Sequence, residues 1–152
     1  MQNITFLEIP TEYQLKPINN KNNYFDKTLN SPFNTELFLR KLYDDTITIF
    51  ESFFVVFLDN SLNVKGYLKV SQGGLTQTSV DVRILFQAAL SCLSTGIIIS
   101  HNHPSGKLIP SEADKRLTEK IKEGCKLLDI TLFDHIIITE ESYYSFADEG
   151  II

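Results

Sequence analysis

The hydrophobic positions of the first half of the chain follow the period of β-strands. Residues 46–59, "TITIFESFFVVFLD", are rich in β-branched and aromatic side chains, and residues 63–74, "NVKGYLKVSQGG", alternate more regularly between apolar and polar. The residues between them, Asp59-Asn60-Ser61, favour a turn. We therefore predict an antiparallel hairpin from these two segments.

After Asp81 the spacing changes to that of an amphipathic helix, which is expected to end at Gly96. A second helix is predicted over residues 111–129, where the apolar positions are Ala113, Leu117, Ile121, Cys125 and Leu128. Residues 96–100, "GIIIS", are typical of a strand buried on both faces, and residues 130–139, "ITLFDHIIIT", predict another strand. This alternation predicts an α/β fold with a mixed β-sheet and packed helices.

Residues 1–33 show no regular period and are rich in asparagine, so we interpret them as an N-terminal arm before one domain over residues 34–152. Such an arm is a candidate contact with a second copy of the chain, as in a homo-oligomer. After Ser31-Pro32, Asn34 is expected to be the N-cap of a short helix. This helix would carry Leu37, Phe38 and Tyr43.

The composition is that of an ordinary domain: 152 residues, 43% hydrophobic and 22% charged, are enough for one core. A net charge of −5 leaves no basic surplus for a phosphate backbone, so we do not expect direct nucleic-acid binding. Cys92 and Cys125 fall in apolar helical patterns and are expected to be small buried hydrophobes, which suits a cytoplasmic protein. No apolar run approaches the roughly 20 residues of a membrane span, and the N-terminus has no signal-peptide pattern.

The stretch with most candidate chemistry is "ISHNHPSGKLIPSEAD", residues 99–114. In an extended chain residues two apart share a face, so His101 and His103 can direct two imidazoles to one point while Asn102 faces the other side. Pro104-Ser105-Gly106 then favours a reversal of the chain, and we expect Asn102 and Ser105 to be mainly turn-forming.

Ser111 and Asp114 have the spacing of a helix N-cap and its N3 partner, and the turn before them can bring Asp114 back to the histidines. Two imidazoles and one carboxylate, with a fourth position for water, form the ligand set of catalytic zinc. The Ser111-x-x-Asp114 pattern alone is also an ordinary cap. The stretch therefore predicts a zinc site, a helix cap or both.

A hydrolytic zinc site also needs a base, since zinc lowers the pKa of a bound water without removing its proton. Glu51 is the candidate because it interrupts an otherwise uncharged run from residue 47 to residue 58. An exposed strand edge or an interruption of the strand would explain Glu51 equally well.

Taken together, Glu51, "HNHPSG" at 101–106 and Pro110-Ser111-x-x-Asp114 resemble the motif of the JAB/MPN (JAMM) metalloproteases. The segments "ESFFVVFLD", "GGLTQTSVDVR", "FDHIIIT" and "YYSFADEGI" look like the RadC branch of that family. This resemblance extends from near Ser31 to the C-terminus.

The resemblance implies an MPN, or cytidine-deaminase-like, core in which His101, His103 and Asp114 bind Zn²⁺. It also implies that Glu51 acts on the zinc-bound water and that Ser111 holds the carbonyl oxygen or the water network. The implied activity is that of a zinc metallopeptidase or isopeptidase: Glu51 would pass a proton to the leaving nitrogen of a peptide or protein substrate.

Two alternatives remain open at this stage. RadC-like proteins carry a DNA-repair label, so the domain is also a candidate partner-binding module in DNA repair, recombination or mobile-element biology. They usually have a helix-hairpin-helix region before this domain, and none is expected in residues 1–33. The other alternative is a metal-stabilised scaffold without turnover.

His135 lies outside the motif, and we expect it to be a structural residue or a partner of a ligand.

Overall fold

A mixed β-sheet of five strands organises the computed structural model, which describes residues 28–43, 47–73 and 79–152. The strands are β1 (Ser52–Leu58), β2 (Val64–Gln72), β3 (Gly96–Asn102), β4 (Thr131–Ile138) and β5 (Tyr143–Ser145). Their spatial order is β2-β1-β3-β4-β5, and only the β3–β4 pair among them is parallel. The mixed α/β architecture and the β1–β2 hairpin are therefore confirmed.

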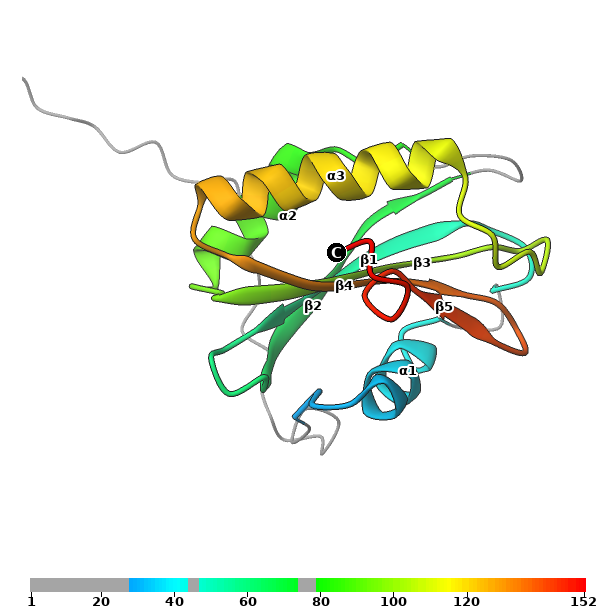
Figure 1. The fold of residues 1–152 in the computed structure, drawn as a ribbon, viewed down its shortest axis with the longest axis horizontal. Coiled ribbons are helices and arrows are strands. Elements are labelled where there is room, and N and C mark those ends of the chain that lie inside the picture. The colour runs from blue at the N-terminus through cyan, green and yellow to red at the C-terminus, as the bar shows by residue number, and fades with distance from the viewer. Residues whose placement is uncertain (1–27, 44–46, 74–78) are drawn as a thin grey trace, which may run out of the picture.

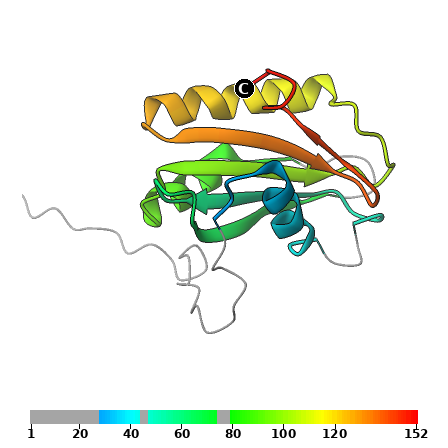
Figure 2. The same ribbon diagram turned by 60° about the horizontal axis from the view of Figure 1, so that its bottom comes forward.

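Helices cover both faces of this sheet. The helices are α1 (Pro32–Arg40), α2 (Val82–Ser91) and α3 (Glu112–Leu127). α2 and α3 lie on one face and α1 on the other (Figure 1). In Figure 2, α3 runs along the sheet beside β4, and the C-terminal residues return to it, where the Lys122 ammonium donates to the carbonyl of Ile151 at 3.3 Å. The sheet is thus the middle layer of three.

Side chains of β1 and β3 alternate between two hydrophobic clusters. Phe53, Phe57 and Ile99 pack with α2 and α3. Val56 and Ile98 face the other way and pack with α1 residues. Because both faces are covered, every residue of β1 and β3 is buried, which explains the apolar runs "FFVVFL" and "III" within them.

β1 begins later than the sequence pattern indicates. The strand predicted from residue 46 starts at Ser52, while residues 47–50 form turns and residues 44–46 lie outside the described ranges. The amide of the Asn102 side chain donates to the carbonyl oxygens of Ile47 (2.6 Å) and Phe50 (2.8 Å). The Asn102 side chain of β3 thus uses the carbonyl oxygens that a neighbouring strand would need to pair with residues 47–50.

The helix after Ser31-Pro32 exists, but its predicted cap is wrong. Ser31 is the N-cap, and its Oγ accepts from the backbone N–H of Asn34 at 3.2 Å. Proline suits the first helical position because it has no N–H that needs a partner there. Tyr43 lies beyond the end of α1 at Arg40.

Three other boundaries differ from the prediction. α2 ends at Ser91, before a left-handed Leu93 with φ of 51°, and not near Gly96. β3 continues two residues further, to Asn102. The short β5, which pairs with β4 over three residues, was not predicted from the sequence pattern.

The expected arm, residues 1–33, lies largely outside the described residues. Of the part that is described, Thr28 bridges to Asn63, and Leu29 is buried with its N–H donating to the carbonyl of Leu62 at 2.9 Å. Both cysteines are free thiols, with Cys125 buried and Cys92 half-buried. Within the described ranges, no helix combines the length and apolar character needed to cross a membrane.

Candidate metal centre

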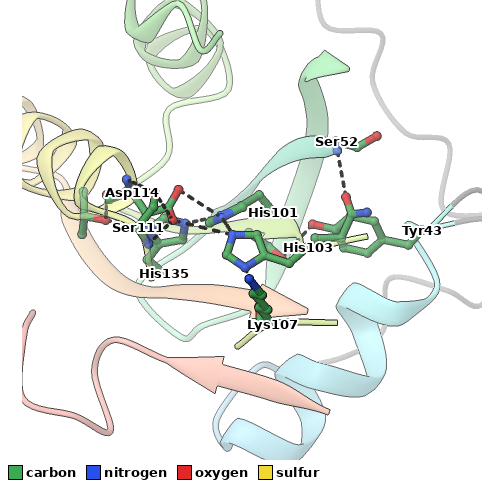
Figure 3. A network of polar contacts seen from close by, with 11 residues as sticks. Tyr43, Ser52, His101, His103, Lys107, Ser111, Asp114 and His135 are labelled. Atoms are coloured by element: carbon green, nitrogen blue, oxygen red, sulfur yellow. Dashed lines mark hydrogen bonds and ion pairs between the residues drawn. The ribbon is translucent and has the colours of Figure 1, made fainter. Parts of the chain in front are cut away.

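The three predicted ligands come together where β3 ends and α3 begins. His101 is near the end of β3, His103 follows it, and Asp114 lies in the first turn of α3 (Figure 3). One ligand atom from each lies within 4.8 Å of the others. The Nε2 atoms of the two histidines are 2.9 Å apart, and His101 Nε2 is 3.2 Å from Asp114 Oδ1. The predicted convergence of these side chains is present.

The turn after β3 orients His103. Its Nδ1 is 2.6 Å from the carbonyl oxygen of Lys107, and a carbonyl can only accept, so Nδ1 carries a proton. The turn is closed by a 3.0 Å bond from the N–H of Gly106 to the carbonyl of His103, with Gly106 at a φ of 75° that favours glycine. In its neutral form His103 therefore presents an unshared pair on Nε2 to Asp114 and His101.

The electrostatics of this cluster favour a positive charge at its centre. Burial alone raises the pKa of Asp114, but the imidazoles of His101 and His103, which donate to this carboxylate when they carry a proton on Nε2, outweigh burial and hold that pKa well below its usual range. In turn, the bond with Asp114 raises the pKa of His103. Two imidazole nitrogens at 2.9 Å repel when both are unprotonated, so a proton or a cation between them is required. This donor set suits Zn²⁺.

Asp114 is both a candidate ligand and part of the helix cap. Its Oδ2 accepts from the N–H of Ser111 at 2.6 Å and from the Ser111 hydroxyl at 2.7 Å. The N–H of Asp114 donates back to Ser111 Oγ at 3.1 Å, which completes a capping box. Oδ1 faces His101. The cap thus directs the carboxylate towards the two histidines, so the predicted helix cap is confirmed and leaves Asp114 placed as a candidate metal ligand.

The hydroxyl of Ser111 has one proton, and in this arrangement the proton points to Asp114. Ser111 also lines the cleft in front of the histidines. A substrate carbonyl would receive a hydrogen bond from this hydroxyl only after it rotates away from the carboxylate.

Glu51 lies immediately before β1, so its expected place within a strand is wrong. Its carbonyl accepts from the N–H of Gly73 at 2.8 Å. The residue nevertheless lines the same cleft as His101, His103 and Asp114, a cavity of about 410 Å³. The structure brings this predicted base to the candidate ligands.

Asn102 holds the segment that carries Glu51. It is fully buried in β3, on the opposite side from the two histidines, and is not the turn residue that we expected. Its Oδ1 accepts from the N–H of Ser52 at 2.7 Å, and its amide donates to the carbonyls of residues 47 and 50. The alternation of the H-x-H pattern predicts which way Asn102 points, but not what it contacts.

His135 and Thr118 continue the polar cluster into the core. His135 Nε2 is 2.8 Å from His101 Nδ1, and His135 Nδ1 is 2.6 Å from Thr118 Oγ1. Burial and the neighbouring His101 lower the pKa of His135 well below its ordinary value, so its ring is neutral. Thr118 was missed by the sequence reasoning, although it is four residues after Asp114 and therefore lies on the same face of α3.

The cleft also has apolar walls, formed by Phe53, Val80, Ile109 and Leu117. Ile109 stands at the cleft with 82% of its surface exposed. The cleft therefore combines a polar floor with an exposed apolar side.

A family model for the RadC-like JAB domain matches residues 29–151. The chain belongs to this family. A UPF0758 protein of Flavobacterium johnsoniae is 52% identical over 101 residues, which cover 66% of this chain and 44% of that protein. A UPF0758 protein of Porphyromonas gingivalis is 42% identical over 103 residues, which cover 67% of this chain and 45% of that protein. A UPF0758 protein of Haemophilus ducreyi is 39% identical over 126 residues, which cover 81% of this chain and 54% of that protein. This RadC-like JAB domain thus spans about half the length of these relatives, and the resemblance deduced from its motifs is confirmed.

Proposed function

We propose that this RadC-like JAB domain is a zinc-dependent hydrolase that cleaves an amide bond in a peptide or protein, as a JAMM-type peptidase or isopeptidase. The observation that carries the proposal is the convergence of His101, His103 and Asp114 in a cleft that also holds Glu51. Three acceptor groups facing one point, two of them histidines, suit a divalent cation better than any role in packing.

In this proposal His101, His103 and Asp114 hold the zinc ion. Zinc, when bound, supplies a Lewis acid and lowers the pKa of a coordinated water. Glu51 takes a proton from the attacking water and transfers it to the leaving nitrogen. Ser111 turns its hydroxyl from Asp114 to the carbonyl oxygen of the substrate, where negative charge develops.

The cleft favours a peptide over a small polar substrate. Its apolar walls, including the exposed Ile109, can cover an aliphatic or aromatic side chain next to the scissile bond. The backbone amide of such a substrate would lie between Glu51 and Ser111, which both line the same cavity.

The test begins with zinc content, measured by elemental analysis on protein purified without a histidine tag or added metal. We expect about one zinc per chain in the wild type and in Glu51→Gln, and none in His103→Ala. Both zinc-containing proteins are then incubated with a library of peptides and isopeptide-linked conjugates, and cleavage is followed by mass spectrometry. Turnover by Glu51→Gln should fall by about 10²- to 10⁴-fold.

Glu119→Gln is the matched control because Glu119 is an exposed acidic residue of α3 outside the residues that line the cleft. It should retain both zinc and turnover. A wild type that takes up no zinc contradicts the proposal. Zinc binding without cleavage of any library member would instead support a non-catalytic module that binds partners in DNA repair, recombination or mobile-element biology.

A further inference from the structure

A row of buried hydrogen bonds connects His101 back to the helix that carries Asp114. It runs from the carbonyl of Asp114 to the hydroxyl of Thr118, then through the ring of His135 to Nδ1 of His101. We propose that Thr118 and His135 are positioning residues that fix the tautomer of His101, so that its Nε2 offers an unshared pair to the metal. The inference rests on zinc binding, the first part of the proposed function.

The direction of the row follows from its first member. The Thr118 hydroxyl donates to the carbonyl oxygen of Asp114, one helical turn earlier, at 2.7 Å. A hydroxyl has a single proton, so its oxygen must then accept the 2.6 Å bond from Nδ1 of His135. The ring of His135 has no exposed surface, and a buried ring favours its uncharged form, so it carries one proton, on Nδ1, and has an unshared pair on Nε2.

That unshared pair decides the state of His101. His135 Nε2 lies 2.8 Å from His101 Nδ1 and can only accept there, so His101 must keep a proton on Nδ1. Its Nε2, 3.2 Å from Asp114 Oδ1, is then available as a ligand. In the opposite arrangement the Thr118 hydroxyl would leave the Asp114 carbonyl and donate to His135 Nδ1, which would place a proton on His101 Nε2 and exclude the metal.

The ring of His135 is also held in place mechanically. It stacks on Phe146 with centroids 4.6 Å apart and meets Phe53 edge-on at 5.9 Å. His135 has no exposed surface, and Thr118 is 2% exposed, so water does not replace either partner. Asp114 therefore acts twice: its carboxylate is a ligand, and its carbonyl ends the row that orients another ligand.

Thr118→Val tests this inference because valine has the shape of threonine but offers no acceptor to His135 Nδ1. Partners that orient a ligand typically contribute about 10- to 100-fold to metal affinity. We expect zinc binding, measured by competition with a chromogenic chelator, to weaken by about that factor in Thr118→Val. Thr118→Ser keeps the hydroxyl and should bind zinc like the wild type.

Thr35→Val is the matched control. Thr35 is likewise buried in a helix, and its hydroxyl donates to the carbonyl four residues earlier, Ser31, at 3.0 Å. It lies in α1, away from the metal centre. Equal zinc affinity for Thr35→Val and the wild type would show that the loss of a buried threonine hydroxyl is not by itself enough to weaken zinc binding.

A spectroscopic measurement reads the tautomers directly. The chain has three histidines, and all of them lie in this cluster, so long-range ¹H–¹⁵N spectra of the imidazoles contain few signals. The zinc-loaded protein should show protons on Nδ1 of both His101 and His135. Equal zinc affinity for Thr118→Val and Thr118→Ser, or a proton on Nε2 of His135, would overturn the inference. Neither readout depends on turnover, so a zinc-binding protein that cleaves nothing contradicts the hydrolase proposal alone.

Discussion

Asn102→Ala is expected to loosen the segment that carries Glu51 without removing a candidate ligand. The Asn102 side chain makes three hydrogen bonds to the backbone of residues 47–52, at 2.6, 2.7 and 2.8 Å, and none to the three ligands. It is completely buried. Alanine therefore removes the contacts that hold this segment against β3.

The expected loss follows from those three bonds. At about 1 kcal/mol for each hydrogen bond, the free energy of unfolding should fall by about 3 kcal/mol. Asn102→Asp keeps the acceptor for Ser52 but points a second oxygen at the carbonyls of Ile47 and Phe50, so it should be no more stable than Asn102→Ala.

Urea unfolding of the metal-free proteins measures this loss. Asn34→Ala is the control, since the Asn34 side chain makes one exposed bond, to Asn30 Oδ1 at 3.1 Å, and its loss should cost less than about 0.5 kcal/mol. We also expect zinc affinity to change little in Asn102→Ala, while turnover falls with the displacement of Glu51. A loss of stability no larger than that of Asn34→Ala would refute the assignment of Asn102 as the residue that holds this segment.

Three further predictions concern the ligands themselves. Asp114→Asn can still accept from the N–H of Ser111 with its side-chain oxygen and donate its amide to His101, so the metal-free protein should be about as stable as the wild type while zinc binding is lost. Asp114→Ala should lose zinc binding and, in urea unfolding, about 1 kcal/mol of stability from the helix cap. Equal stability of Asp114→Ala and the wild type would argue against the cap. Zinc at 100 times its dissociation constant should stabilise the wild type by about 2.7 kcal/mol in thermal unfolding, and a chelator should reverse this; a similar shift in His103→Ala would contradict the assigned ligand set. The bond with Asp114 raises the pKa of His103 above its ordinary 6.5, so a proton competes with zinc for His103 below that raised pKa. Zinc affinity should therefore fall as the pH is lowered through it. A zinc affinity that stays constant between pH 8 and pH 6 would contradict this prediction.

The elements that were predicted well have a local cause in the sequence. The apolar run "GIIIS" indicates a strand covered on both faces, and β3 is such a strand. Ser111 and Asp114 form the predicted capping box because both partners are three residues apart on one helical turn. The convergence of His101 and His103 follows from the two-residue period of an extended chain.

The elements that were predicted wrongly depend on contacts between distant parts of the chain. β1 starts at Ser52 and not near residue 46 because a side chain 50 residues later binds the preceding backbone. The three-residue β5 has too few positions to show a period, and it exists as a partner of β4. Neither feature has a signal within its own segment.

The sequence alone determined the alternation of strands and helices and the capped start of α3, because these depend on spacings of two to four residues, and it identified the three candidate ligands because they lie in one motif within residues 101–114. Only the tertiary structure decided that Asn102 positions the segment of Glu51 and that Thr118 and His135 lie behind His101. Those contacts join residues 17 to 55 positions apart. They form because sheet pairing and helix packing bring the segments together, and a hydrogen bond depends on that final geometry and not on proximity along the chain.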